Sequence, residues 1–100
     1  MLTYEEAKSS AKNFITDTLK YDDTDIWEEK TVAKSYGWFF VLATKQFLAT
    51  KDKAFSKPGT PSLLVEKSGH IITLGTFKPL YQHIKEFDEK FSPHSKNSTN

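Results

Sequence analysis

The sequence predicts an α+β domain: an N-terminal helix, an antiparallel sheet of three to five strands, and a C-terminal helix packed on the sheet. Three observations predict this order: a helical stripe near the start, an aromatic run with strand alternation at residues 36–42, and a second helical stripe near the end. The chain of 100 residues has the size of one domain. We expect residues 1–91 to form this domain and 92–100 to be a disordered polar tail.

The first helix is predicted to run from residue 4 to about residue 20. Thr3 and Glu6 have the spacing of a capping box, in which each side chain bonds the backbone N–H of the other residue. Apolar residues then recur at spacings of three and four and line one helix face: Tyr4, Ala7, Ala11, Phe14, Ile15 and Leu19. Poor helix formers at 21–24 end the helix.

Two strands are expected next. The first lies near residues 26–35, at or near a sheet edge, and Gly37 is expected at a bulge or bend that interrupts its pairing. The second covers 38–44, where alternate residues point to opposite faces and both faces are apolar. Either helices cover both faces or one face meets a partner, and both readings stay open. Residues 45–50 extend this strand or turn a corner.

The remaining elements form a hairpin and a helix. A loop is expected at 51–61, followed by strands at 62–67 and 70–75 that are joined by a two-residue turn at Ser68-Gly69. The last helix begins at Pro79 and carries an apolar stripe. The residues expected to form the structural core are Trp38, Phe40, Leu42, Phe14, Ile84 and Phe87.

Composition excludes several classes of protein. The chain has no cysteine, which excludes disulfides and thiolate metal sites. It starts without the basic and apolar segments of a signal peptide, and its longest apolar run is far shorter than the ~20 residues of a membrane span. We therefore expect a soluble, cytoplasmic protein with no membrane partner. All fourteen basic residues are lysine, and the lack of arginine argues against a nucleic-acid partner.

No pattern of residues indicates catalysis. The three histidines have no metal-ligand spacing, no serine lies in a nucleophile elbow, and the four glycines are dispersed rather than gathered in a phosphate-binding loop. We expect no catalytic residue, no cofactor and no metal, so the protein is predicted not to be an enzyme.

An acidic segment around Trp27 is the candidate binding site. Five acids fall within eight residues there, and tryptophan is a common energetic anchor of protein interfaces. The candidate partner-binding residues are Asp23, Asp25, Trp27, Glu28 and Glu29. The alternative, in which Trp27 packs on the core and the charges form an ordinary solvated surface, stays open.

Several short motifs together resemble the immunity protein 35 family, which also includes small YrhB-like bacterial proteins. The motifs occur in a fixed order at residues 4–7, 29–30, 36–40, 47–52, 59–61, 64–71, 74–76 and 79–80. One departure lies at 51–61, where lysine and proline replace the alanine- and glycine-containing link of familiar members.

The resemblance implies an immunity protein of a bacterial polymorphic toxin system. Such a protein binds a cognate toxin in the cytoplasm and blocks it sterically, without chemistry of its own. Two other functions remain open: a small chaperone-like protein that holds unfolded clients on exposed apolar surface, such as one face of 38–43, and a small enzyme or ligand binder. A homodimer formed through an apolar strand face or edge also remains open.

Overall fold

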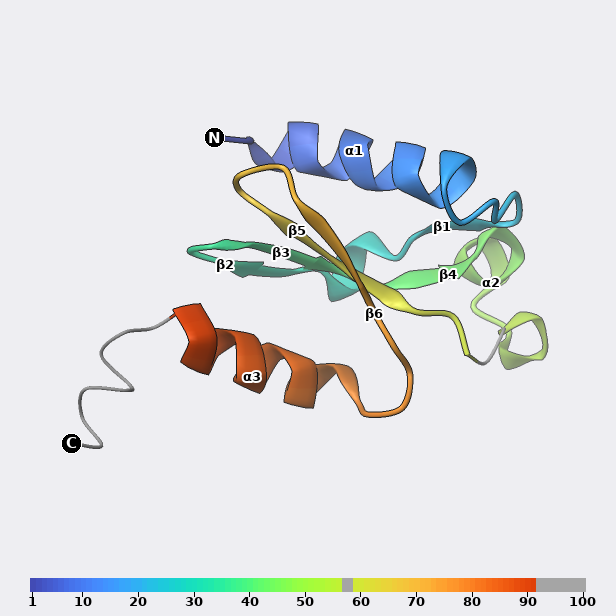
Figure 1. Ribbon diagram of the computed structural model, residues 1–100. Helices are drawn as coiled ribbons and strands as arrows, with labels where there is room; N and C mark the ends of the chain where they lie inside the picture. Colours follow the sequence, from blue (N-terminus) through green and yellow to red (C-terminus); the bar gives the residue numbers. More distant parts are fainter. Residues whose placement is uncertain (57–58, 92–100) are drawn as a thin grey trace.

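The computed structural model describes residues 1–56 and 59–91, and it has three layers (Figure 1). Helix α1 (Tyr4–Asp17) lies on one face of a sheet, and helix α3 (Leu80–Phe91) lies on the other. The predicted α+β class is therefore confirmed. The predicted tail at 92–100 lies outside the described residues.

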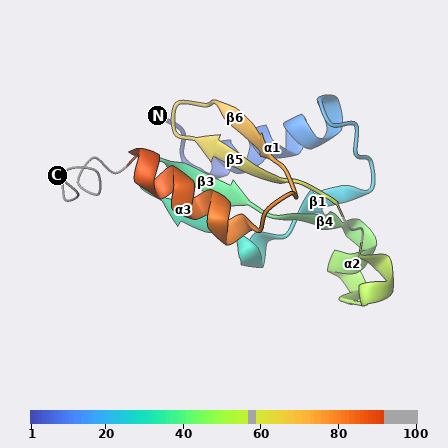
Figure 2. The same ribbon diagram turned by 60° about the horizontal axis from the view of Figure 1, so that its bottom comes forward.

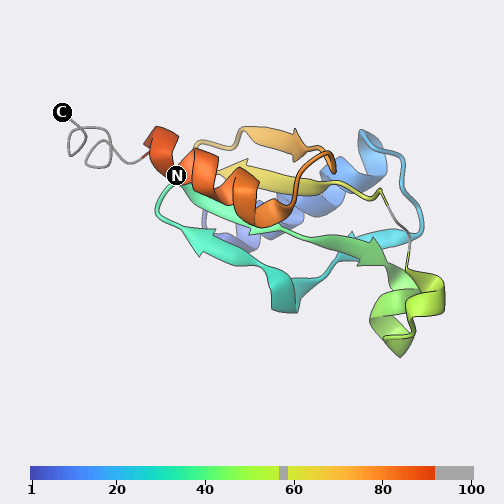
Figure 3. The same cartoon turned by 90° about the horizontal axis from the view of Figure 1, so that it is seen from below.

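The main sheet is antiparallel and has four strands in the order β2-β3-β5-β6. Its strands are β2 (Val32–Lys34), β3 (Gly37–Phe40), β5 (Ser62–Glu66) and β6 (Ile71–Leu74). A second, two-stranded sheet pairs β1 (Thr24–Ile26) with β4 (Leu42–Thr44). Helix α2 (Lys45–Thr50) and the 3₁₀ helix η2 (Lys53–Phe55) follow β4 at one end of the molecule (Figure 3).

Strand β3 is buried on both faces, because alternate side chains enter two different apolar clusters. Trp38 and Phe40 join α1 residues such as Ala11 in one cluster, whereas Phe39 joins Leu64 and Leu74 in the other. Figure 2 shows α3 lying along the sheet on the second side, and Phe87 of α3 contacts Phe39 edge to face with centroids 6.0 Å apart. A second helix, rather than a partner, thus covers this face.

The expected core residues occupy these two clusters. Leu42 is buried with Trp38 and Phe40, and Phe14 packs on the same cluster from α1. Ile84 and Phe87 are partly buried and pack on the second cluster from α3. Full burial of a large apolar side chain stabilises a fold by about 1.5–3 kcal/mol, and the partly buried Phe14, Ile84 and Phe87 contribute less.

Two strand predictions need correction. Residues 24–34 form β1, the 3₁₀ helix η1 (Glu28–Lys30) and β2 instead of one strand, and residues 37–44 form β3 and β4 instead of one. Both breaks occur at a contact between the two sheets, where the backbone N–H of Trp27 donates to the Val41 carbonyl at 2.7 Å. Residues 45–50 neither extend the strand nor simply turn a corner, because they form α2. Strands of three residues are too short to show a reliable alternation.

Gly37 does not interrupt the sheet. It pairs with Lys34 on one side and with Glu66 on the other. A Cβ atom at this position would lie 2.3 Å from the Val65 carbonyl oxygen, so the close approach of β5 requires glycine.

The remaining boundaries differ slightly from the predictions. Helix α1 has the predicted capping box and ends at Asp17, shortly before Lys20 adopts a left-handed conformation at φ 61°. The β5–β6 turn has three residues, 67–69, because Glu66 and His70 still share a hydrogen bond. Within residues 1–56 and 59–91, no helix is both long and apolar enough to cross a membrane.

Candidate partner-binding site

The predicted acidic segment lies beside the lobe formed by α2 and η2. Thr44 places this lobe, because its hydroxyl accepts a hydrogen bond from the Phe47 N–H at 3.1 Å and donates one to the Phe55 carbonyl at 2.6 Å. The first bond caps α2 and the second ties η2 to the same residue. The lobe therefore has a defined position next to η1, although α2 itself buries none of its side chains fully.

Trp27 is half-buried at the base of the lobe. Its ring meets Phe47 edge to face with centroids 4.9 Å apart. The ammonium groups of Lys30 and Lys51 lie 5.3 Å and 5.2 Å from its ring centroid, within the range of cation–π attraction. We name Trp27, Phe47, Lys30, Lys51 and Glu29 the Trp27 surface. Trp27 thus both packs on a neighbouring element and reaches the surface.

Glu28 faces α1 rather than the lobe. Its carboxylate accepts hydrogen bonds from the Lys8 ammonium at 2.8 Å and from the Tyr4 hydroxyl at 2.9 Å. These two donors, Lys8 first, hold the pKa of Glu28 below its ordinary value. Glu28 therefore connects η1 to α1, so its role is structural.

Glu29 lies on the lobe side of η1. It accepts a hydrogen bond from Lys51 at 3.2 Å, and its side chain is 77% exposed. Lys51 lowers the pKa of Glu29, so the carboxylate is charged at neutral pH. An exposed ion pair of this kind contributes little to stability and can exchange partners at small cost.

The two aspartates lie on the other side of the segment. Asp25 belongs to β1, accepts the Ile26 N–H at 2.7 Å, and has Lys12 of α1 at 3.9 Å. Asp23 accepts a hydrogen bond from the Thr24 hydroxyl at 3.1 Å, and its backbone carbonyl accepts the Lys45 N–H at 2.8 Å. The structure thus brings Trp27 and Glu29 together beside Lys51, whereas Glu28 and Asp25 lie beside α1 and Asp23 lies at the start of α2.

Sequence reasoning missed Phe47 and Lys51. Both come from the α2 segment, for which no helix was expected. The available signal was Thr44, a good N-cap residue directly before Lys45. The lysine partners also turn the acidic segment into a charge-balanced surface, because Lys8, Lys12 and Lys51 each lie beside one of its acids.

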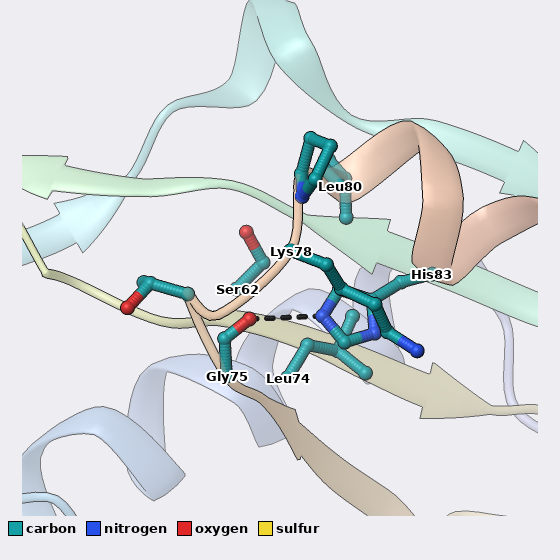
Figure 4. A pocket seen from close by; sticks show the side chains of 8 residues that line it. Ser62, Leu74, Gly75, Lys78, Leu80 and His83 are labelled. Carbon is teal, nitrogen blue, oxygen red and sulfur yellow. Dashed lines mark hydrogen bonds between the residues drawn. The ribbon is translucent and has the colours of Figure 1, made fainter.

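A separate hollow of about 220 Å³ lies where β6 leads into α3 (Figure 4). His83 of α3 lines it, together with Ser62 and Lys78. The His83 Nε2–H donates to the Gly75 carbonyl at 2.8 Å. Among residues 1–56 and 59–91, no group of three or more histidine, aspartate or glutamate side chains is placed to hold a metal ion.

The fold and the site define a small α+β protein with an aromatic surface site at one end. The chain belongs to the YrhB family. It is 32% identical over 93 residues to Uncharacterized protein YrhB of Escherichia coli (strain K12), and the alignment covers 90% of this chain and 93% of that protein. No model of a known protein family matches the sequence. No solved structure matches the fold.

Proposed function

We propose that this protein is an immunity protein that binds a cognate bacterial polymorphic toxin in the cytoplasm and blocks it sterically, without catalysis. The resemblance of the ordered motifs to the immunity protein 35 family supports the proposal. The observation that carries it is the Trp27 surface, because a half-exposed tryptophan beside an exchangeable ion pair has the chemistry of a protein-binding anchor.

The toxin contact combines apolar burial with charge exchange. The exposed part of the Trp27–Phe47 pair supplies the apolar contact, and a basic side chain of the toxin takes the place of Lys51 beside Glu29. The displaced Lys51 remains over the aromatic rings, 5.2 Å from the Trp27 centroid. Complementary charge of this kind favours fast and selective association.

The first test is a pull-down with the product of the adjacent upstream gene co-expressed. One stoichiometric partner that is toxic without this protein supports the proposal. Many weak and unrelated partners, or none, would contradict it.

Glu29→Lys tests the site itself. This variant reverses the charge at an exposed position that is paired with Lys51, so folding is retained while toxin affinity falls at least tenfold. Glu89→Lys, an exposed acid on α3, is the matched control with the same charge change. Equal affinities for the two variants would place the toxin contact elsewhere. Glu28 is a poorer choice, because its replacement also frees Tyr4 and Lys8.

The chaperone-like alternative requires an exposed apolar face at residues 38–43, and the fold buries this strand. Trp38, Phe39 and Phe40 are all buried, so neither face of this strand is available to unfolded clients. For this reason we propose neutralisation of one folded partner rather than general client binding.

A further inference from the structure

Phe77 is an exposed aromatic side chain that the fold holds in place. It follows β6 and its side chain is 81% exposed. Its ring lies against Gly75 so closely that a Cβ there would be 2.6 Å from two ring carbons. The His83 ring meets the Phe77 ring edge to face, with centroids 5.5 Å apart. Glycine and histidine therefore both position this phenylalanine.

His83 fixes the loop beneath Phe77. It is only 6% exposed, and its Nε2–H donates to the Gly75 carbonyl (Figure 4). This bond connects α3 to the end of β6 and supports the Gly75 backbone on which Phe77 rests. Tyr81, four residues after Phe77, is 73% exposed at the start of α3. Exposed aromatic side chains such as Phe77 and Tyr81 are typical of a protein-binding surface.

The hollow next to Phe77 is rich in hydrogen-bond donors. The hydroxyls of Ser62 and Thr76 line it and have no hydrogen-bond partner within the described part of the chain. Lys78 also lines it, and its ammonium group is paired with Glu86 of α3 at the surface. One cation and two free hydroxyls suit a carboxylate, which accepts several hydrogen bonds at once.

We propose that Phe77, Tyr81 and this hollow form a docking site for a carboxylate-bearing segment of a partner protein. An apolar side chain of the segment packs on Phe77 and Tyr81. A neighbouring glutamate or aspartate enters the hollow, replaces Glu86 beside Lys78 and accepts hydrogen bonds from Ser62 and Thr76. Charge complementarity with Lys78 selects this occupant. The site shares no residue with the Trp27 surface, so its test does not depend on whether the proposed function is correct.

The test is an NMR titration of the full chain with the blocked peptide acetyl-Leu-Glu-Leu-amide. We expect chemical-shift changes at the amides of residues 62 and 75–82, at up to about 10 mM peptide, which covers millimolar affinities. The same peptide with glutamine in place of glutamate is expected to bind at least about threefold more weakly. No shift, shifts elsewhere, or equal binding of both peptides would overturn the proposal.

Two variants sharpen the test. Glu86→Gln removes the internal competitor for Lys78, so peptide affinity rises about two- to fivefold, whereas Glu89→Gln on the same helix leaves it unchanged. Lys78→Gln lowers affinity by a similar factor, and Lys85→Gln is its matched control. Inorganic phosphate is titrated in parallel. If phosphate shifted the same amides at lower concentration than the glutamate peptide, a phosphate site would replace the proposed carboxylate site.

Discussion

At Asp88 of α3, two side chains from the β2–β3 hairpin converge on one carboxylate. The Tyr36 hydroxyl donates to it at 2.8 Å and the Lys34 ammonium at 3.0 Å. Burial raises the pKa of Asp88, but these two hydrogen bonds outweigh burial and bring it below its ordinary value. Burial and the bond to Asp88 together raise the pKa of Tyr36. The contact fastens the last turns of α3 to the sheet edge.

A pKa lowered in the folded state has a defined effect on stability. The Asp88 carboxylate contributes stability above its unfolded pKa of about 4, and this contribution is lost as the pH falls through the lower folded pKa. Acid should therefore loosen α3.

Tyr36→Phe tests this contact at the scale of one residue. The phenyl ring still stacks on Phe91, whose centroid lies 4.5 Å away, but the hydroxyl donor is lost. We expect the pKa of Asp88 to rise and the loss of stability below pH 4 to become smaller. The pKa is measured by NMR titration of the Asp88 carboxyl carbon. Tyr81→Phe is the control, and an unchanged Asp88 pKa in Tyr36→Phe would refute the assignment.

Among the elements, α2 depends most on one capping residue. It has six residues, fewer than two turns, and buries no side chain fully. An isolated helix of this length is unstable in water, so tertiary contacts must maintain it. Thr44 caps the helix through the Phe47 N–H and ties it to η2 through the Phe55 carbonyl.

Thr44→Val is expected to open the α2–η2 lobe without unfolding the domain. The volume is retained, but the cap is lost at a cost of about 1 kcal/mol. Hydrogen exchange of the amides at 45–55 should accelerate about fivefold, while those of β3 and β5 keep their protection. Thr73→Val, at an exposed position on β6, is the control. An unchanged exchange rate in the lobe would show that Thr44 is not its main fastening.

The same elements show what the sequence can predict. The capping box of α1 and the stripe of α3 are local signals that predict their helices correctly, and the alternation at 38–44 predicts strand structure but not its division into β3 and β4. Helix α2 has only the N-cap residue Thr44 as a local signal, because Phe47 and Thr50 favour strands intrinsically and the hydrogen bond to Phe55 is non-local. In the candidate site, Trp27 and its acids are visible in the sequence. Their partners Lys8 and Lys51 lie 20 or more residues away and are not.

For the whole molecule, the decisive feature is that both faces of the sheet are covered. Helix α1 covers the cluster of Trp38 and Phe40, and α3 covers the cluster of Phe39, Leu64 and Leu74. Each helix protects apolar surface that the sheet cannot hide by itself. Neither helix can be removed without exposing a large apolar patch.

A chain that ends at residue 79 is therefore expected to lose cooperative folding. The uncovered Phe39 face should bind a hydrophobic dye and promote self-association, as measured by dye fluorescence and light scattering. A chain that ends at Phe91 is the control, because every described contact of α3 is retained. A monomeric, cooperatively folding chain of 79 residues would contradict this view.

The position of α3 at the end of the fold also has a consequence for protein synthesis. The ribosome releases α1 and the strands β1 to β6 before it releases Leu80–Phe91. Until translation of this last helix is complete, the nascent sheet is covered on one face only, with Phe39, Leu64 and Leu74 facing water or the ribosome. The domain should therefore complete its folding only after α3 has left the ribosome, and nascent chains that stall or terminate before that point should be the form most prone to aggregation.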